Sequence, residues 1–260
     1  MSRFKSTLNL MRKTVIIGNW KLNKTIKETQ DFTRDLRQSL RKVPENVVVG
    51  ITPTHLAIPA ALEEVKGSEI QVGAQNGYFK ETGAFTGQVS MPMIKDAGAH
   101  FCLVGHSEQR QFFGETDETV NAKTKAALEN NLTPVVCIGE LLEEREANKT
   151  NEVLSTQLKE GLKDIQIENG EALVVAYEPV WAIGTGKTAT PEMAEEAHQH
   201  VRKVLGEIFG SEKAEQIVIQ YGGSAKPANA RELLDQANID GLLVGGASLE
   251  VESFSAIINS

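Results

Sequence analysis

Cysteine, clustered basic residues and long apolar runs are scarce in this sequence. Two cysteines, Cys102 and Cys137, occur among 260 residues, and each lies in an apolar run typical of a buried strand. A disulfide framework is therefore not expected, and a reducing compartment is favoured. The formal net charge is -8 and Lys and Arg do not cluster, which argues against a nucleic-acid-binding surface. No apolar segment approaches the roughly 18 residues of a membrane-spanning helix. We predict a soluble, cytoplasmic protein that binds neither nucleic acid nor membrane.

The composition is that of an ordinary globular protein, with 40% hydrophobic and 24% charged residues and no linker rich in Pro or Ser. Residues 1–12 precede the first strand-like run, include a second methionine at Met11 and lack the apolar segment of a signal peptide. We interpret residues 1–12 as an N-terminal extension or tag, and residues 13–260 as one catalytic domain.

Strand-like and helix-like segments alternate from Thr14 to the end of the chain. The expected strands are short apolar runs, as in parallel strands covered on both faces. They span residues 14–20, 47–52, 69–75, 100–105, 133–138, 171–177, 216–221 and 239–244. Eight such pairs form either a closed (β/α)₈ barrel or an open, doubly wound sheet. No GxGxxG motif follows the first strand, which weakens the dinucleotide-binding alternative.

Apolar residues at helical spacing mark the segments between the strands. One stripe consists of Phe32, Leu36, Leu40 and Val43, and others run over residues 154–165 and 193–208. Two helix starts are also predicted: Thr25 with Glu28 resembles a capping box, and Thr190 is followed by Pro191.

The stretch EALVVAYEPVWAIGTGKTAT, residues 171–190, ends a buried strand at the carboxylate of Glu178. Pro179 favours an extended conformation for Glu178, so the acid is expected at the mouth of the strand. The small residues after it suit a lid. Taken alone, Glu178 is equally well a solvated carboxylate or a helix cap. The string GTGKT ends like a phosphate-binding P-loop, but Trp181 stands where that motif requires glycine.

Polar residues also follow other strands, which is where a barrel carries its functional groups. The endings are GNWK after strand 1, QN after strand 3, GHSE after strand 4, YGGS after strand 7 and GGAS after strand 8. Individually, Lys21 suits a surface lysine, His106 a helix cap, and the glycine pairs tight turns. Together, the endings predict one pocket whose glycine-rich backbone binds a phosphate monoester.

No metal site is expected. His198 and His200 are two residues apart on a predicted helix and face different directions, and no acid or thiol completes a zinc set around them.

The strings GNWKLNK, AQNGY, GAFTG, VGHSEQR, CIGE, AYEPVWAIGTGK, YGGS and LLVGGAS resemble the triosephosphate isomerase family, in order and spacing, from Lys13 to the C-terminus. The resemblance implies a TIM barrel that interconverts glyceraldehyde 3-phosphate and dihydroxyacetone phosphate without a cofactor. It implies that Glu178 is the base and that His106 polarises the carbonyl and moves protons between the oxygens. For this family a neutral imidazole, with its pKa lowered by a helix N-terminus, is a standard example.

The same resemblance implies roles for the remaining residues of the pocket. Lys21 supplies positive charge to the phosphate and the enediolate, Asn19 adds a hydrogen bond, and Glu108 is a supporting acid near the lysine. Closure of residues 179–188 excludes water. The phosphate is held through backbone N–H groups of Gly184, Ser224, Gly245 and Gly246.

The segment from Gln75 to Gln88 resembles the loop with which the family docks into a second subunit, so a homodimer is expected. Gln88 and Gln109 stand where the family often has an acid and an arginine that pair across the interface. Because both positions change together, no buried charge is orphaned and a neutral pair is expected.

Two other functions fit the sequence less well. An aldolase or other sugar-phosphate barrel enzyme requires a Schiff-base lysine facing the substrate, and strand 6 has none. A non-catalytic descendant has no need to keep Asn19, Lys21, His106 and Glu178 together.

Overall fold

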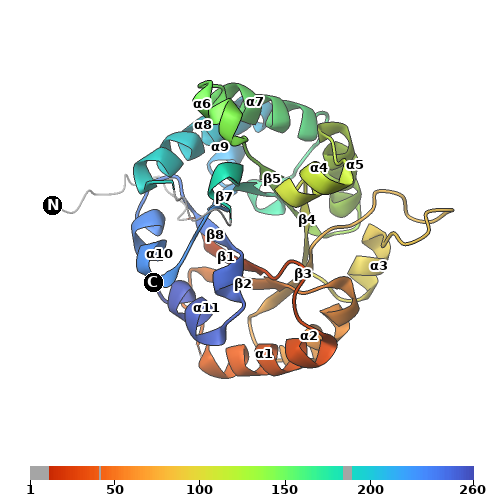
Figure 1. Cartoon of the computed structure of the whole chain (residues 1–260). Coiled ribbons are helices and arrows are strands. Elements are labelled where there is room, and N and C mark those ends of the chain that lie inside the picture. The colour runs from red at the N-terminus through yellow and green to blue at the C-terminus, as the bar shows by residue number, and fades with distance from the viewer. Residues whose placement is uncertain (1–11, 41, 184–188) are drawn as a thin grey trace.

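The computed structural model describes residues 12–40, 42–183 and 189–260 and has a closed barrel of eight parallel strands surrounded by helices (Figure 1). Each strand pairs with the next along the chain, and β8 pairs with β1. The strands are β1 Thr14–Asn19, β2 Val47–Thr52, β3 Gln71–Ala74, β4 Phe101–Val104, β5 Thr133–Ile138, β6 Val174–Tyr177, β7 Val218–Tyr221 and β8 Gly241–Val244. The prediction of a (β/α)₈ barrel is confirmed, and the open-sheet alternative is wrong.

All eight expected strands are present, and most are shorter than predicted. The largest difference precedes β6, where Gly170–Ala172 forms a 3₁₀ turn instead of strand. The side chain of Asn169 accepts a hydrogen bond from the Glu171 N–H and so caps this turn. An apolar pattern does not reveal such a local cap.

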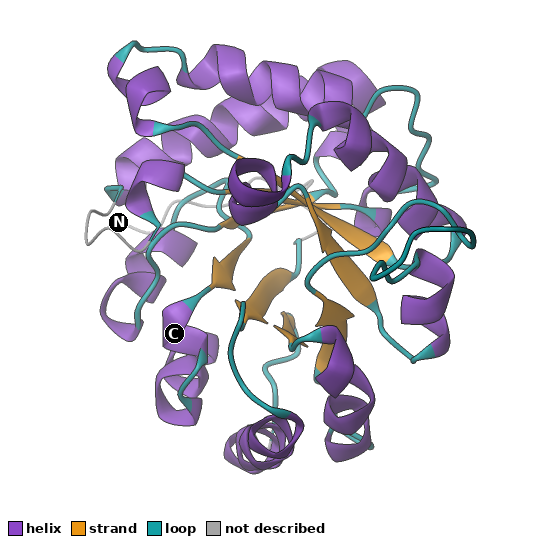
Figure 2. Cartoon of the chain, turned by 45° about the vertical axis from the view of Figure 1, so that its right-hand side comes forward, coloured by secondary structure: helices purple, strands orange, loops and turns teal. Residues whose placement is uncertain are grey.

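Helices follow the strands and form the outer ring seen in Figures 1 and 2. In the described part of the chain they are α1 Ile26–Ser39, α2 Ile58–Glu64, α3 Met91–Asp96, α4 Ser107–Phe113, α5 Asp117–Glu129, α6 Leu142–Glu146, α7 Thr150–Gly161, α8 Pro191–Phe209, α9 Ser211–Ala214, α10 Pro227–Leu234 and α11 Val251–Ile258. Short 3₁₀ turns occur at His55–Ala57, Gly170–Ala172, Val180–Ala182 and Gly246–Ser248.

Both predicted helix starts are confirmed. Thr25 and Glu28 form a reciprocal capping box at the start of α1. The Thr190 side chain accepts a hydrogen bond from the Met193 N–H, with proline at the first position of α8. The apolar stripe of the first helix continues past its end, since Leu40 and Val43 are buried beyond Ser39.

Alternation along each strand divides the core in two. Ile16 packs with the cluster between the strands and the helices, whereas Val15 and Ile17 belong to the cluster inside the barrel. The ring of Phe101 fills the interior where Gly50 and Gly73 have no side chain, and a Cβ at either glycine would collide with it. The barrel interior is therefore a packed core, and binding sites are restricted to its two ends.

Arg12 contacts the barrel, although the sequence prediction places it in the extension. Its guanidinium forms ion pairs with Asp240 and Glu215, at 2.6 and 3.0 Å. Contacts of the barrel therefore begin one residue before the predicted boundary at Lys13, and the nature of residues 1–11 lies outside the described residues. Among the described helices, none is long and apolar enough to cross a membrane.

Candidate active site

A cavity of about 510 Å³ opens at the carboxyl ends of the strands, and we call it the upper cavity. It brings together nearly all the site residues predicted from the sequence: Asn19, Lys21, His106, Glu178, Ser224, Gly245 and Gly246 line it. A larger cavity of about 590 Å³, at the amino ends of the strands, has none of them in its lining. The upper cavity is therefore the candidate active site, as expected for a barrel.

Glu178 stands at the mouth of β6, where the sequence analysis placed it. Its N–H donates to the Ile138 carbonyl at 2.7 Å, and only 2% of Glu178 is exposed to solvent. Gly139 and Gly222 make room for it, because a Cβ at Gly139 would overlap the Glu178 carbonyl and one at Gly222 would lie 2.8 Å from Glu178 Cγ. Both positions require glycine because their backbones lie against Glu178, with no room for a side chain.

The carboxylate of Glu178 contacts the imidazole of His106, with Oε1 3.0 Å from Nε2. Its other oxygen, Oε2, accepts a hydrogen bond from the Ser107 N–H at 3.1 Å. Burial raises the pKa of Glu178, but the contacts with His106 and the Ser107 N–H outweigh it and hold the pKa below its usual value. The acid is thus ionised and able to accept a proton.

His106 is the N-cap of α4, and its Nδ1 accepts a hydrogen bond from the Glu108 N–H at 3.2 Å. Only an unprotonated Nδ1 accepts, so the remaining ring proton of the neutral imidazole is on Nε2, facing Glu178. Burial lowers the pKa of His106, and the Glu178 carboxylate raises it further than burial lowers it. The helix start acts in the same direction as burial. Any movement of the carboxylate away from the ring therefore favours the neutral form.

Lys21 has a left-handed backbone conformation, with φ of 52°. Such a conformation is costly outside glycine and is characteristic of functional sites. Two side chains hold it: Asn19 Oδ1 accepts from the Lys21 N–H at 3.0 Å, and Gln75 Nε2 donates to the Lys21 carbonyl at 2.8 Å. The Lys21 ammonium pairs with Glu108 at 2.6 Å. Gln75 was not assigned this positioning contact from the sequence.

Glycine and serine after β7 and β8 form the opposite wall. Within the described residues, the backbone N–H groups of Ser224, Gly245 and Gly246 have no hydrogen-bond partner. A Cβ at Gly246 would meet no atom within 4 Å, so this glycine is not required by packing. Free N–H groups beside the ammonium of Lys21 suit an anion. Gly184, also predicted to bind phosphate, and residues 184–188 of the predicted lid lie outside the described residues.

Glu140 is a buried acid beside the site whose contacts the sequence did not reveal. Its Oε1 accepts hydrogen bonds from the Tyr177 hydroxyl and from Trp181 Nε1, at 3.1 and 2.9 Å. Burial raises the pKa of Glu140, and the hydrogen bonds from Trp181 and Tyr177 oppose that rise. Glu140 thereby anchors the first residues after Pro179. The sequence signal that could have identified Glu140 was an acid just after the fifth strand, in the string CIGE.

His198, His200, Cys102 and Cys137 do not line the upper cavity. His198 is buried in α8, and His200 contacts Ser155 and the Asn151 carbonyl. In the part of the chain that the structure describes, no group of three or more His, Cys, Asp or Glu side chains is placed to hold a metal ion. Cys102 and Cys137 are free and buried, and burial raises the pKa of Cys102 to about 12, so neither thiol has reactive character.

Residues 14–260 match the family model described as triosephosphate isomerase. The chain belongs to the triosephosphate isomerase family. Proteins named triosephosphate isomerase from Clostridium botulinum strain Langeland and Moorella thermoacetica are each 52% identical to it over 249 residues. These alignments cover 96% of this chain and 100% and 99% of the relatives. One from Fusobacterium nucleatum subsp. nucleatum is 51% identical over 250 residues, covering 96% of this chain and 99% of the relative. The resemblance inferred from the motifs is confirmed.

Proposed function

We propose that the chain is a cofactor-independent triosephosphate isomerase in which Glu178, His106 and Lys21 carry the reaction. It interconverts D-glyceraldehyde 3-phosphate and dihydroxyacetone phosphate through an enediolate, a reaction of glycolysis and gluconeogenesis. Membership of the family supports the reaction. The observation that carries the residue assignment is that these three side chains, far apart in sequence, line one cavity.

Glu178 removes the proton from the carbon next to the carbonyl and returns it to the adjacent carbon. The lowered pKa of Glu178 keeps the base ionised before the step. A proton next to a carbonyl is weakly acidic, so the carbonyl oxygen must be stabilised as it gains charge. His106 serves this purpose by donating from Nε2, because Nδ1 is already an acceptor from the Glu108 N–H.

Lys21 provides the positive charge that the phosphate and the developing enediolate require. Its ammonium is held by Glu108, and Asn19 and Gln75 fix its backbone, so little ordering is needed on binding. Ser224, Gly245 and Gly246 hold the phosphate with backbone N–H groups, and Gly184 is proposed to add another. Closure of residues 179–188 over the cavity completes the proposal: excluding water strengthens each electrostatic interaction.

Coupled spectrophotometry tests the assignment. Glyceraldehyde 3-phosphate is supplied, and dihydroxyacetone phosphate is detected with a dehydrogenase that reduces it at the expense of NADH. The expected result is NADH oxidation that depends on the protein and is lost from the Glu178→Gln variant purified in parallel. Equal rates from the two proteins would refute Glu178 as the base.

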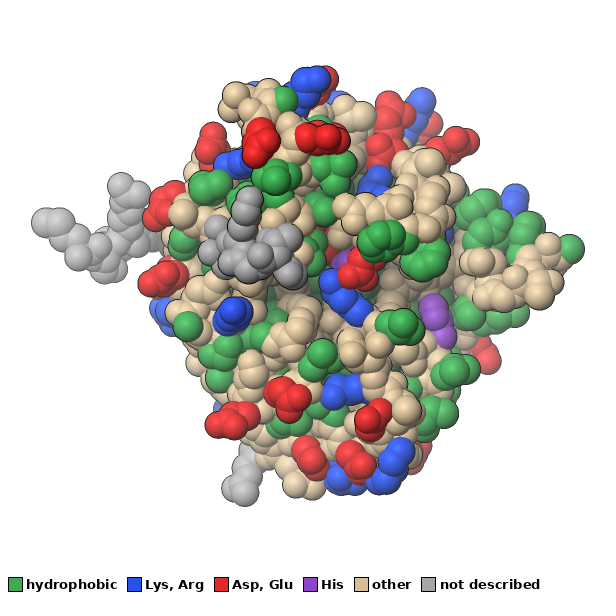
Figure 3. Space-filling model, in the orientation of Figure 1, with side chains coloured by type: hydrophobic (Ala, Val, Ile, Leu, Met, Phe, Trp, Pro, Cys, Tyr) green, Lys and Arg blue, Asp and Glu red, His purple; other side chains and the backbone are tan. Residues whose placement is uncertain are grey.

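The chain is also proposed to form a homodimer through the loop of residues 75–88. That loop joins β3 to α3 and extends beyond the ring of helices (Figure 1), and Figure 3 shows hydrophobic side chains gathered on it. Large exposed apolar residues follow the first four strands in turn: Leu22, Leu56, Phe85, Phe112 and Phe113. Adjacent strands place these residues along one side of the barrel, where a second copy would bury them.

Within the described chain no hydrogen bond joins Gln109 to Gln88. Gln109 Oε1 accepts a hydrogen bond from Asn76 Nδ2 at 3.2 Å, and Asn76 Oδ1 accepts one from Lys123 at 2.8 Å. The amide of Gln109 is thus already ordered before association. A neutral pair with the partner's loop gives a dimer whose affinity depends weakly on salt.

Light scattering tests the dimer at micromolar concentration. The mass of two chains is expected at both low and high salt, and Phe113→Asp is expected to give single chains because it places a charge in an apolar interface. A monomer for the unsubstituted protein would refute the proposal.

The cytoplasm is the proposed location, supported by two free thiols that have not formed a disulfide.

A further inference from the structure

Glu178 lies in a wall between two cavities. One is the upper cavity, and the second, which we call the side cavity, has a volume of about 280 Å³ and lies between the end of β5 and the start of α4. Its lining includes Ser107, Gln111, Leu141, Glu144, Gln157 and Glu178. Among the described residues, Glu178 alone lines both cavities.

The two oxygens of the carboxylate contact different sides of this wall. Oε1 is 3.0 Å from His106, which lines the upper cavity and not the side cavity. Oε2 accepts the hydrogen bond from Ser107, which lines the side cavity and not the upper one. A proton on Oε2 is therefore adjacent to residues that do not line the upper cavity.

The side cavity is suited to water. A water molecule needs a cavity volume of at least about 10–15 Å³ and two to four polar partners. The side cavity, at about 280 Å³, is large enough. The Ser107 hydroxyl has no hydrogen-bond partner within the described part of the chain, and the Gln111 amide is exposed at the rim. Glu144 adds a carboxylate to the lining, and one of its oxygens, Oε2, accepts from the Leu141 N–H. The Gln157 amide is already bonded to the Gly139 backbone through both its oxygen and its nitrogen, so the polar groups for water are those of Ser107, Gln111 and Glu144.

We propose that the side cavity is the route by which Glu178 exchanges the substrate-derived proton with solvent during a turnover. The inference rests on the proposed role of Glu178 as base. After proton removal the enediolate fills the upper cavity, and the carboxylic acid of Glu178 carries the proton. In D₂O, rotation of the carboxyl group turns the protonated oxygen toward the side cavity. Its O–H bond then breaks, the proton passes to water there, and a deuteron from that water forms the new O–D bond, which a second rotation returns to the upper cavity. Return of this deuteron to carbon labels the product.

Substitutions that obstruct the side cavity test the route. Leu141→Trp and Gln111→Trp enlarge two side chains that line it from different elements, the first just before α6 and the second in α4. Leu142→Trp is the matched control, since Leu142 is 39% exposed against 36% for Leu141 but does not line the cavity. Each full-length protein converts glyceraldehyde 3-phosphate in D₂O at low conversion, and the product is removed at once by the NADH-dependent dehydrogenase.

Mass spectrometry and NMR then give the fraction of product labelled at C1. We expect the label to fall by about twofold or more in at least one obstructed variant, because proton exchange with water is impeded. The kcat/KM of these variants and the label from Leu142→Trp are expected to stay close to the unsubstituted values. An unchanged label in both obstructed variants, or an equal fall in Leu142→Trp, overturns the route. Absence of isomerisation by the unsubstituted protein would instead overturn the proposed function.

Discussion

The carboxyl ends of the strands carry Lys21, His106 and Glu178, whereas the amino ends carry Arg12, Arg202 and Asp240. At the first end the polar groups are poorly suited to stability. Lys21 has a positive φ, and backbone N–H groups at Gly245 and Gly246 lack partners in the described chain. These features cost stability and are explained by the proposed chemistry.

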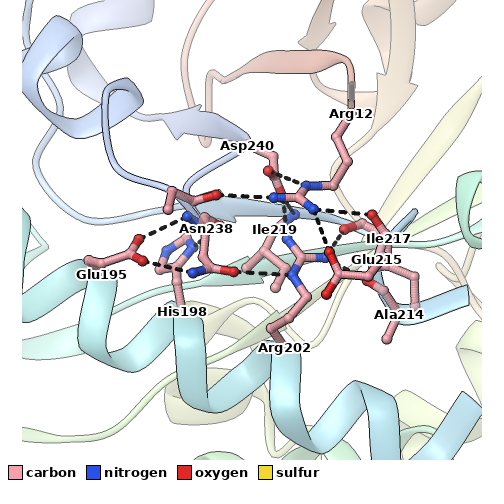
Figure 4. A network of polar contacts seen from close by, with 11 residues as sticks. Arg12, Glu195, His198, Arg202, Ala214, Glu215, Ile217, Ile219, Asn238 and Asp240 are labelled. Carbon is pink, nitrogen blue, oxygen red and sulfur yellow. Dashed lines mark hydrogen bonds and ion pairs between the residues drawn. The ribbon is translucent and has the colours of Figure 1, made fainter. Parts of the chain in front are cut away.

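At the other end the charged groups are paired with one another and with the backbone (Figure 4). Asp240 accepts from Arg12 and Arg202 and from the Ile219 N–H, and Arg202 also donates to the carbonyls of Ala214 and Ile217. The network joins α8 to the segments that enter β1, β7 and β8. Its members line neither the upper nor the side cavity, so we infer that it serves stability alone.

Loss of Asp240 should give the largest effect and should act on stability alone. Asp240→Leu leaves the guanidinium of Arg202 buried without its partner, which typically costs about 3–5 kcal/mol. Urea unfolding should show this loss, while kcat of the folded protein stays near that of the unsubstituted chain. The control is Arg202→Met with Asp240→Leu, which should regain much of the stability because no buried arginine is then left without a partner at position 202, and Arg12 keeps its ion pair with Glu215. A double variant no more stable than Asp240→Leu would contradict this explanation.

Shortening Glu178 should have the opposite signature. Glu178→Asp retracts the carboxylate by one methylene, and a misplacement of about 1 Å can cost on the order of 10²-fold in rate. The loss should appear mainly in kcat, with a smaller change of stability in urea than for Asp240→Leu. Glu171→Asp, the same change at an exposed acid near the amino ends, is the matched control. Near-normal turnover by Glu178→Asp would remove it from the proposed mechanism.

Features of the carboxyl ends were largely predictable from the sequence. Parallel strands buried on both faces are continuous apolar runs, and the polar residue that ends each run marks the rim of the barrel. Glu178 and Lys21 were found in this way, and the motif resemblance supplied their roles. The predicted ends of the strands were less accurate. Residues 171–173 were predicted as strand, but the Asn169 side chain caps a 3₁₀ turn there, and β6 begins only at Val174.

Contacts between residues distant in sequence were not predictable. Arg12 was assigned to an extension, yet its partner Asp240 is 228 positions away. The hydrogen bond of Gln75 to the Lys21 carbonyl and the two contacts of Glu140 likewise depend on tertiary packing. A pattern within one segment carries no information about such partners, so positioning residues are missed more readily than the residues they position.

Lys21 lies at the carboxyl ends of the strands, where we expect the loss of a charge to affect ligand binding. Lys21→Met should lower the affinity for a phosphorylated competitive inhibitor and should lower turnover, because a hydrogen bond to a charged group contributes about 1.5–3 kcal/mol. Inhibition constants measured at low and high salt would check this. Lys13→Met removes an exposed lysine at the amino ends and should leave the affinity unchanged. Equal affinities of the Lys21→Met and unsubstituted proteins would exclude Lys21 from phosphate binding.

The smallest predicted effect concerns pH and His198. This ring is buried between Tyr177 and Tyr221, and burial lowers its pKa from 6.5 to about 3. The unfolded chain therefore binds a proton that the folded chain does not at pH values between about 3 and 6.5, so stability from this group is complete above pH 6.5 and falls as pH decreases. At pH 5.5 the loss should be about 1.4 kcal/mol, since one pKa unit corresponds to 1.36 kcal/mol.

Urea unfolding of the unsubstituted protein and of His198→Phe at pH 7.5 and 5.5 isolates this contribution. The variant loses the hydrogen bond from His198 to the Asn238 carbonyl, and this loss lowers its stability by a similar amount at both pH values. Other titrating groups act equally in both proteins, and only the difference between the two pH dependences reports His198. The loss of unfolding free energy between pH 7.5 and pH 5.5 should be smaller in His198→Phe than in the unsubstituted protein by about 1.4 kcal/mol. An exposed imidazole, His100→Phe, controls for the general loss of a histidine. If His198→Phe lost as much stability on acidification as the unsubstituted chain, burial of a neutral ring at this position would not contribute to acid sensitivity.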